Sequence, residues 1–253
     1  MNEFFALPMA DRGLISLVVR PTARRGASLL SRSLVQRPLL PAAAWVSSAG
    51  CSCRGVSTKA VPLDESSASW GNNLRGLGHN NYLGKILNAR VYEVAKETPL
   101  QYAPSLSTEL GNAVYLKRED LQPIFSFKIR GAYNKIAQLS REQLKAGIVA
   151  CSAGNHAQGV ALSASIIGVD AVIVMPTGTP SIKVDAVRKL KGNVRLHGAT
   201  YDEAAAEAHR LVQQEGRTLI HPFDDPYVIA GQGTIGMEVL KQMTGKKLDA
   251  VFV

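Results

Sequence analysis

The stretch Ser126-Phe127-Lys128-Ile129-Arg130-Gly131-Ala132 places a single lysine at the point where a helical pattern begins. Apolar residues then recur at the i, i+3, i+4, i+7 spacing of a buried helix face, at Ile129, Ala132, Tyr133 and Ile136. We therefore expect a helix over about 128–139. The apolar flanks of Lys128 would lower the pKa of its amine, as a Schiff-base lysine requires. A solvated surface lysine fits the same spacing, so the spacing alone leaves both interpretations open.

A turn of small residues, Ser152-Ala153-Gly154-Asn155-His156, opens a second helical pattern at about 155–167. Ser152 and Asn155 are typical N-cap residues. A helix N-terminus presents unpaired N–H groups and the positive end of the helix dipole, which together suit a carboxylate or a phosphate. The turn is therefore a candidate anion site, with a plain helix cap as the alternative. His156 taken alone is more often a packed or capping histidine than an acid or base.

Strands and helices alternate around these two motifs. The expected strands are 113–117, 147–151, 171–175, 194–196, 218–220 and 249–253, and the expected helices are 82–91, 128–139, 155–167, 181–190, 201–214 and 230–243. The run at 171–175 is apolar throughout and is ended by Pro176, as in a strand buried on both faces. Strands separated by helices of this length need crossover connections. We therefore expect an α/β fold with a parallel sheet and helices on both faces.

Gly231-Gln232-Gly233-Thr234-Ile235-Gly236 matches the dinucleotide-binding pattern G-x-G-x-x-G letter by letter. That fingerprint requires a strand immediately before it and an acidic residue about 20 residues after it. A turn-rich loop at 222–226 precedes the motif instead, and the sequence supplies no such acid. We expect these glycines to allow close packing of helices.

Positive charge is concentrated at the start of the chain. The formal net charge of the 253 residues is +9, and residues 1–60 account for +6 of it, with seven arginines and one lysine against two acids. Arginine-rich, acid-poor composition with frequent Ser and Ala is typical of an organelle-targeting segment, for a mitochondrion or a plastid. We expect residues 1–60 to lie outside the fold. The nearly neutral remainder argues against nucleic acid as a partner.

The rest of the chain divides into a linker and a body. Residues 61–81 are rich in Ser, Asn and Gly and are expected to form a flexible linker, and residues 82–253 are expected to form the folded body. No run approaches the roughly 20 apolar residues of a membrane span. Only Cys151 of the three cysteines lies in the body, so we expect neither a disulfide framework nor a metal site.

Several long motifs occur in the order in which the biosynthetic threonine dehydratases carry them. They lie at 116–120, 126–133, 152–160, 182–187, 222–226 and 228–234. On these motifs, residues 82–253 resemble the threonine ammonia-lyases of the serine/threonine dehydratase family. The resemblance implies the architecture of fold-type-II pyridoxal-phosphate (PLP) enzymes, similar to the tryptophan synthase β subunit. It also implies a small mobile subdomain at about 115–220.

The resemblance assigns roles to the candidate residues. Lys128 would bind pyridoxal 5'-phosphate covalently and remove the Cα proton of the substrate, and Phe127 would pack against the cofactor ring. Asn155 would hydrogen-bond the phenolic oxygen of the cofactor. The substrate carboxylate would be bound by the turn, at Ser152, Ala153, Gly154, Asn155 and His156. The implied reaction converts L-threonine, or L-serine, into a 2-oxo acid and ammonia, and for threonine it is the first step toward isoleucine.

Two features keep alternatives open. Serine racemases of the same group carry a second serine where this chain has Ala153, and alanine cannot transfer a proton, so dehydration is favoured over racemisation. The implied glycine-rich loop for the cofactor phosphate would follow Val253, so we expect a C-terminally truncated catalytic domain with little activity by itself. Serine dehydratase or serine racemase is the alternative enzyme. A non-catalytic protomer that acts by association is the alternative of another class, and the full-length protein is expected to be a homo-oligomer.

Overall fold

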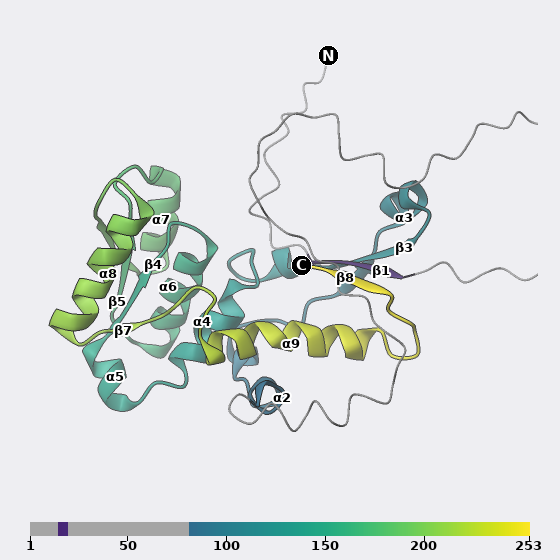
Figure 1. The fold of residues 1–253 in the computed structure, drawn as a ribbon, viewed down its shortest axis with the longest axis horizontal. Coiled ribbons are helices and arrows are strands. Elements are labelled where there is room, and N and C mark those ends of the chain that lie inside the picture. The colour runs from purple at the N-terminus through teal and green to yellow at the C-terminus, as the bar shows by residue number, and fades with distance from the viewer. Residues whose placement is uncertain (1–14, 20–80) are drawn as a thin grey trace, which may run out of the picture.

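The computed structural model describes residues 15–19 and 81–253, and for 15–19 it describes the backbone alone. Two four-stranded sheets lie at opposite ends of the described chain, with helices between them (Figure 1). Sheet A has the strand order β2-β3-β1-β8, and sheet B has the order β6-β5-β4-β7. The candidate site lies at one edge of sheet B.

Sheet B is the predicted parallel sheet. Its strands are β4 (Ile148–Cys151), β5 (Ala171–Met175), β6 (Asn193–Leu196) and β7 (Thr218–Leu219), and every neighbouring pair is parallel. Residues of β4 and β5 are buried without exception, because helices cover both faces. One face packs on α6 (Asn155–Ile167) and α7 (Ser181–Lys189), and the other packs on α8 (Tyr201–Glu215). The expectation of a parallel sheet with helices on both faces is confirmed.

Two helices, α4 (Lys128–Ile136) and α9 (Pro226–Gln242), connect the two ends of the molecule (Figure 1). They approach each other closely at glycines. A Cβ atom on Gly231 would lie 2.6 Å from the carbonyl oxygen of Arg130, and one on Gly233 would lie 2.5 Å from Ile86 of α2 (Tyr82–Leu87). The Gly231–Gly236 motif thus lies inside α9. Its first two glycines allow close helix packing, as expected, whereas a Cβ atom on Gly236 would meet nothing within 4 Å.

Sheet A differs from the expectation. Its strands are β1 (Ile15–Val19), β2 (Leu100–Tyr102), β3 (Ala113–Lys117) and β8 (Ala250–Phe252), and all three pairings are antiparallel. The expected parallel series therefore includes neither β3, which pairs with β1 and β2, nor β8, which pairs with β1. Residues 103–112, which include α3 (Pro104–Leu110), connect β2 to β3. A parallel crossover needs about a dozen or more residues, whereas an antiparallel pair can be joined by a shorter connection.

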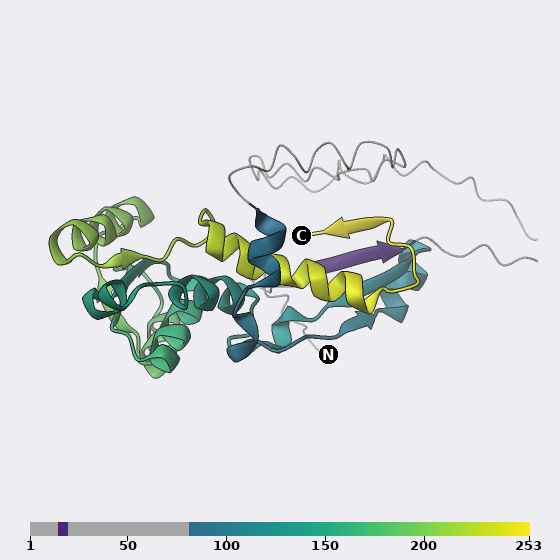
Figure 2. The same cartoon turned by 90° about the horizontal axis from the view of Figure 1, so that it is seen from below.

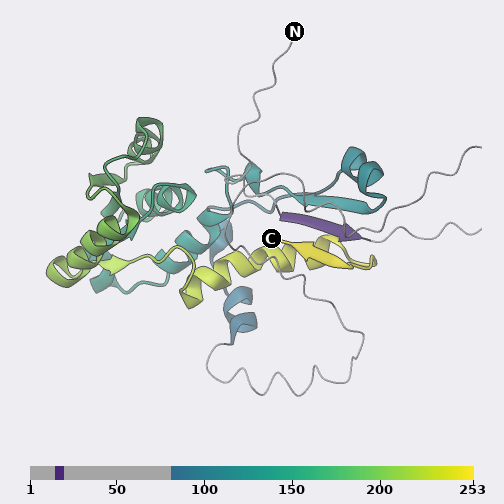
Figure 3. The same cartoon turned by 45° about the horizontal axis from the view of Figure 1, so that its top comes forward.

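The strand β1 corrects the expectation that residues 1–60 lie wholly outside the fold. Its five residues pair with β3 on one side and with β8 on the other, and Figures 2 and 3 show it between them. The rest of the expected targeting segment, and the linker up to residue 80, lie outside the described residues. Because β1 is hydrogen-bonded to a neighbouring strand on each side, its short apolar run is enough to form a central strand of the sheet.

The remaining elements of the described chain are short helices. They are η3 (Val91–Glu93), α3 (Pro104–Leu110), η4 (Glu119–Leu121) and α5 (Arg141–Ala146). Helix α9 begins four residues earlier than expected, because Asp225 accepts hydrogen bonds from the N–H groups of Tyr227 and Val228 and Pro226 occupies the first position. Within residues 81–253, no helix combines the length and the apolar character needed to cross a membrane.

Candidate active site

Lys128 is the first residue of α4, and its amine is held in a half-buried place. The Nζ atom donates a hydrogen bond to the carbonyl oxygen of Pro222, 2.9 Å away, and lies 5.3 Å from the centre of the Phe127 ring. Burial lowers the pKa of the Lys128 amine below its ordinary value. Desolvation is the usual way in which a lysine is made nucleophilic near neutral pH, so its surroundings suit a reactive amine.

The turn at 152–156 follows the carboxyl end of β4 and leads into α6. Gly154 is the N-cap residue of α6, and the Ser152 hydroxyl accepts a hydrogen bond from the Gly154 N–H, 3.3 Å away. The expectation that Ser152 or Asn155 caps the helix is therefore wrong, because Asn155 is already the first helical residue. A Cβ atom on Gly154 would meet no atom within 4 Å, so the space in front of the turn is open.

The two motifs meet although about two dozen residues separate them. Helix α6 crosses α4 at Lys128, since a Cβ atom on Gly159 would lie 3.2 Å from the Lys128 carbonyl oxygen. His156 Nε2 lies 2.9 Å from the carbonyl oxygen of Ile220, two residues before the carbonyl that accepts from Lys128. Both motifs thus bond to one backbone segment, Ile220 to Pro222, which follows β7. Ligands of open α/β sheets bind at this carboxyl edge of the strands.

His156 is buried, with 4% of its surface exposed, and its hydrogen bonding fixes its tautomer. A carbonyl oxygen only accepts, so the neutral ring carries its proton on Nε2 and leaves Nδ1 as an acceptor. Nδ1 is buried and has no hydrogen-bond partner among the described residues. Burial lowers the pKa of His156 to about 4, against the opposing bond to Ile220 and with help from nearby Lys128 and His221. The ring is therefore a neutral acceptor near pH 7.

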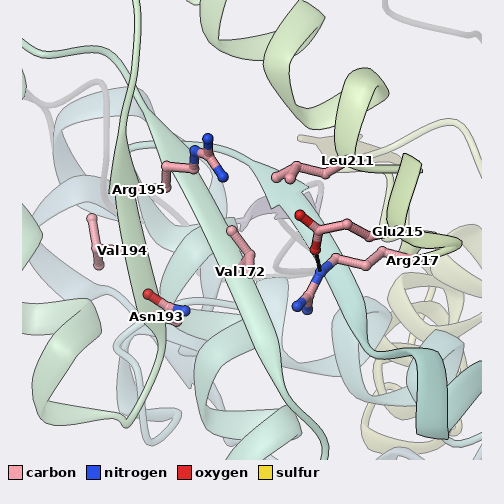
Figure 4. A pocket seen from close by; sticks show the side chains of 7 residues that line it. All are labelled: Val172, Asn193, Val194, Arg195, Leu211, Glu215 and Arg217. Atoms are coloured by element: carbon pink, nitrogen blue, oxygen red, sulfur yellow. Dashed lines mark hydrogen bonds and ion pairs between the residues drawn. The ribbon is translucent and has the colours of Figure 1, made fainter. Parts of the chain in front are cut away.

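A separate pocket lies at the opposite edge of sheet B. Its volume is about 390 Å³, and its lining is Val172, Asn193, Val194, Arg195, Leu211, Glu215 and Arg217 (Figure 4). Asn193 begins β6 and Arg217 directly precedes β7, so the pocket faces the amino ends of the strands. Arg217 is paired with Asp170 and Glu215 at 2.7 Å, and Arg195 is paired with Glu207 at 2.8 Å. Each guanidinium in the pocket thus already has a carboxylate partner.

Residues 91–253 match the family model described as "Pyridoxal-phosphate dependent enzyme". The chain belongs to this family of pyridoxal-phosphate-dependent enzymes. The expected fold-type-II architecture is thereby shown, and Lys128 remains the predicted reactive amine of the chain.

Two threonine dehydratases are among the relatives of this chain. "Threonine dehydratase, mitochondrial" of Schizosaccharomyces pombe is 58% identical over 175 residues, which are 69% of this chain and 29% of the relative. "Threonine dehydratase 1 biosynthetic, chloroplastic" of Solanum lycopersicum is 58% identical over 178 residues, 70% of this chain and 29% of the relative. The chain therefore spans less than a third of the length of these curated relatives.

A solved structure of a threonine deaminase is similar to this chain as well. The processed form of threonine deaminase isoform 2 from Solanum lycopersicum superimposes with a TM-score of 0.63 and 47% sequence identity. The match covers 75% of this chain and 54% of that one.

The described residues fit two ends of a PLP-bound amino acid. Lys128 offers the amine that a pyridoxal aldehyde requires, and the open turn at Gly154 offers helix N–H groups to a carboxylate. The buried, unpartnered Nδ1 of His156 offers an acceptor to a bound donor group. Among the described residues, no cluster of three or more His, Cys, Asp or Glu side chains could hold a metal ion.

Sequence reasoning missed two parts of this site. The segment from Ile220 to Pro222 contributes carbonyl oxygens, which carry no side-chain signal. Arg130, which lies beside the site and is paired with the buried carboxylates of Glu119 and Glu238, was also missed. The signal that could have found Arg130 is its position inside the buried face of α4, between Ile129 and Ala132.

Proposed function

We propose that the whole protein catalyses the PLP-dependent conversion of L-threonine into 2-oxobutanoate and ammonia, the first step of isoleucine biosynthesis. The observation that carries the proposal is the meeting of Lys128 and the Ser152–His156 turn on one backbone segment. The names of the relatives support the choice of threonine as the substrate.

Each residue of the site has a task in this reaction. PLP supplies the electron sink that stabilises negative charge at the substrate Cα. Lys128 holds the cofactor and, once released, removes the Cα proton, which its lowered pKa permits. Phe127 packs beside the cofactor ring, and Asn155 bonds its phenolic oxygen. The N–H groups and short side chains of the turn, from Ser152 onward, bind the substrate carboxylate.

Ala153 favours elimination over racemisation. A methyl group cannot deliver a proton to the opposite face of the substrate, so position 153 would offer no donor for racemisation. We expect Ala153→Ser to raise racemisation relative to 2-oxobutanoate release, which chiral analysis of the residual threonine would measure. Ala153→Gly is the matched control, because it changes the size of the residue without adding a hydroxyl. An unchanged ratio in Ala153→Ser would show that this position does not set the outcome.

We also propose how the other segments of the protein are organised. We propose that most of residues 1–60 target the protein to a mitochondrion or a plastid, and both kinds of organelle occur in the names of the relatives. Residues 61–81 would be a linker, and residues 82–253 would form the first part of the catalytic domain, with a small mobile subdomain within about 115–220. The whole protein would be a homo-oligomer.

Covalent trapping tests the proposed function. The protein is incubated with PLP, reduced with borohydride, digested and mapped by mass spectrometry. We expect the pyridoxyl group on Lys128 and a loss of labelling in Lys128→Ala. Assay of 2-oxobutanoate from L-threonine and of pyruvate from L-serine then separates the two substrates. Label on a different lysine, or preferential release of pyruvate, would contradict the proposal.

A further inference from the structure

Four charged side chains that have no task in the proposed reaction are buried together beside α4. They are Lys117 on β3, Glu119 on η4, Arg130 on α4 and Glu238 on α9, each at most 2% exposed. We call them the ion cluster. Arg130 lies 2.8 Å from Glu119 and 2.6 Å from Glu238, and Lys117 lies 2.6 Å from Glu238. Two cations balance two carboxylates, so the cluster is neutral as a whole.

The guanidinium of Arg130 is hydrogen-bonded on every side. Its Nε and Nη2 atoms donate to the two carboxylate oxygens of Glu119, each at 2.8 Å. Nη1 donates to Glu238 at 2.6 Å and to the Thr234 hydroxyl at 3.1 Å, and Nη2 also donates to the Lys96 carbonyl at 3.1 Å. Burial alone would lower the pKa of Arg130, but the bonds to both carboxylates outweigh it and hold the pKa above its ordinary value.

Stability alone does not account for such a cluster. Apolar side chains of the same volume stabilise a core about as well, because the loss of hydration offsets the attraction between buried charges. A forked guanidinium between two carboxylates does impose one orientation. In this protein it joins η4, α4 and α9. The first turn of α4 cannot slide along α9 or rotate without leaving a buried carboxylate unpaired.

Lys128 lies in that same first turn, two residues before Arg130. Successive residues of an α-helix are about 100° apart, so these two side chains leave the helix on nearly opposite sides. Arg130 therefore holds the turn from the side of η4 and α9. The Lys128 amine faces the Pro222 carbonyl, and α6 packs on the Lys128 backbone at Gly159.

We propose that Arg130 is a positioning residue for Lys128. By bridging Glu119 and Glu238, its guanidinium holds the first turn of α4 so that the Lys128 amine stays at the Pro222 carbonyl, beside the Ser152–His156 turn. The proposal takes from the proposed function only that Lys128 is the reactive amine.

The test measures the reactivity of Lys128 without turnover. Protein is labelled with trace acetic anhydride across a pH series, and acetylation of the Lys128 peptide is quantified by mass spectrometry against an added free amine. The variants are Arg130→Lys, which keeps the charge but loses the fork, and Glu238→Gln, which keeps the shape but removes one anchor. Leu211→Ala is the control, because it weakens the core on the far face of sheet B without touching α4.

We expect the Lys128 titration midpoint of Arg130→Lys to rise by about one pH unit toward that of a solvated lysine. Glu238→Gln should shift it in the same direction by less, and Leu211→Ala should leave it in place. A profile for folded Arg130→Lys that superimposes on that of the parent protein would overturn the proposal. An equal shift in Leu211→Ala would overturn it too, because the effect would then follow stability alone. These readings stand whether or not the protein releases 2-oxobutanoate.

Discussion

Lys128 and Arg130 are two cations on one helical turn with opposite surroundings. Arg130 is fully buried, and each of its N–H groups has an acceptor in the ion cluster or beside it. Lys128 is half-buried, its amine bonds to one backbone carbonyl, and no described carboxylate forms an ion pair with it. Nearby carboxylates raise the pKa of a cation and keep it charged. A buried amine without a carboxylate partner has a lowered pKa and loses its proton more readily. One turn thus combines an immobile charge with a reactive group.

The strongest test of this contrast removes the Lys128 amine. In the complete enzyme we expect Lys128→Ala to reduce turnover by at least roughly 10²- to 10⁴-fold from the loss of the base alone. The free energy of unfolding should change by no more than about 1 kcal/mol, because one hydrogen bond is lost. Kinetic assays and urea unfolding measure the two effects, with the exposed Lys145→Ala as the control. If Lys128→Ala lost far more stability than this, Lys128 would be a structural residue like Arg130, and the contrast between the two cations would be wrong.

Arg130→Met should show the reverse balance. We expect the free energy of unfolding to fall by about 3–5 kcal/mol, because Glu119 and Glu238 each lose a buried partner. Addition of Glu119→Gln should recover part of that loss by removing one uncompensated charge. Urea unfolding of both variants provides the measurement. A loss below about 1 kcal/mol in Arg130→Met would mean that water reaches the cluster and solvates the two carboxylates.

A third prediction concerns His156 and the dependence of stability on pH. Its pKa in the folded protein, about 4, lies below the ordinary 6.5, so the unfolded chain takes up a proton that the folded protein does not. The stability that depends on this residue is complete above about pH 6.5 and is lost as the pH falls toward 4, by roughly 3 kcal/mol in total. Urea unfolding across this range should show a steeper acid loss for the parent than for His156→Gln. Parallel curves for the two proteins would refute the assignment.

The smallest expected effect concerns the glycines that bring α9 against α4. Gly231→Ala places a Cβ atom 2.6 Å from the Arg130 carbonyl oxygen, and we expect a loss of about 1–3 kcal/mol from overpacking. Gly236→Ala is the matched control on the same helix, because a Cβ atom there meets nothing within 4 Å. It should raise stability by about 0.5–1 kcal/mol through helix propensity. Similar values for the two variants would mean that the close approach at Gly231 is not limiting.

Sheet B could be predicted from the sequence because its signals are local. The apolar run of β5 ends at Pro176, and α6 ends at a glycine in the left-handed conformation, Gly168 with φ of 82°. Sheet A could not be predicted in the same way. The strand β2 has three residues, and β1 lies within an arginine-rich segment whose composition indicates a leader. The helix α5 was missed although Ser140 and Gln143 form a capping box, a signal that was available.

The candidate site shows the same division. Lys128 and the Ser152–His156 turn could be singled out because each combines small or apolar neighbours with the start of a helix. The burial of Arg130 could have been predicted from its position in α4, but its partners could not. A charged residue carries no local mark of a partner more than a hundred positions away, as Arg130 and Glu238 show. Backbone carbonyls such as that of Pro222 could not be predicted either, because every residue has one and the sequence does not mark which of them bind.

The place of β1 also bears on the order in which the chain can fold. Ser16 pairs with Leu116 on one side and with Phe252 on the other, so sheet A joins residues near both ends of the sequence. Contacts at such separation form late, because the entropy of closing a long loop is lost before the pairing compensates for it. The strands of sheet B are made consecutively and become available long before residue 252 leaves the ribosome. We therefore expect folding to proceed from the middle of the chain outward, and β1 to keep an unpaired edge until β8 has been synthesised.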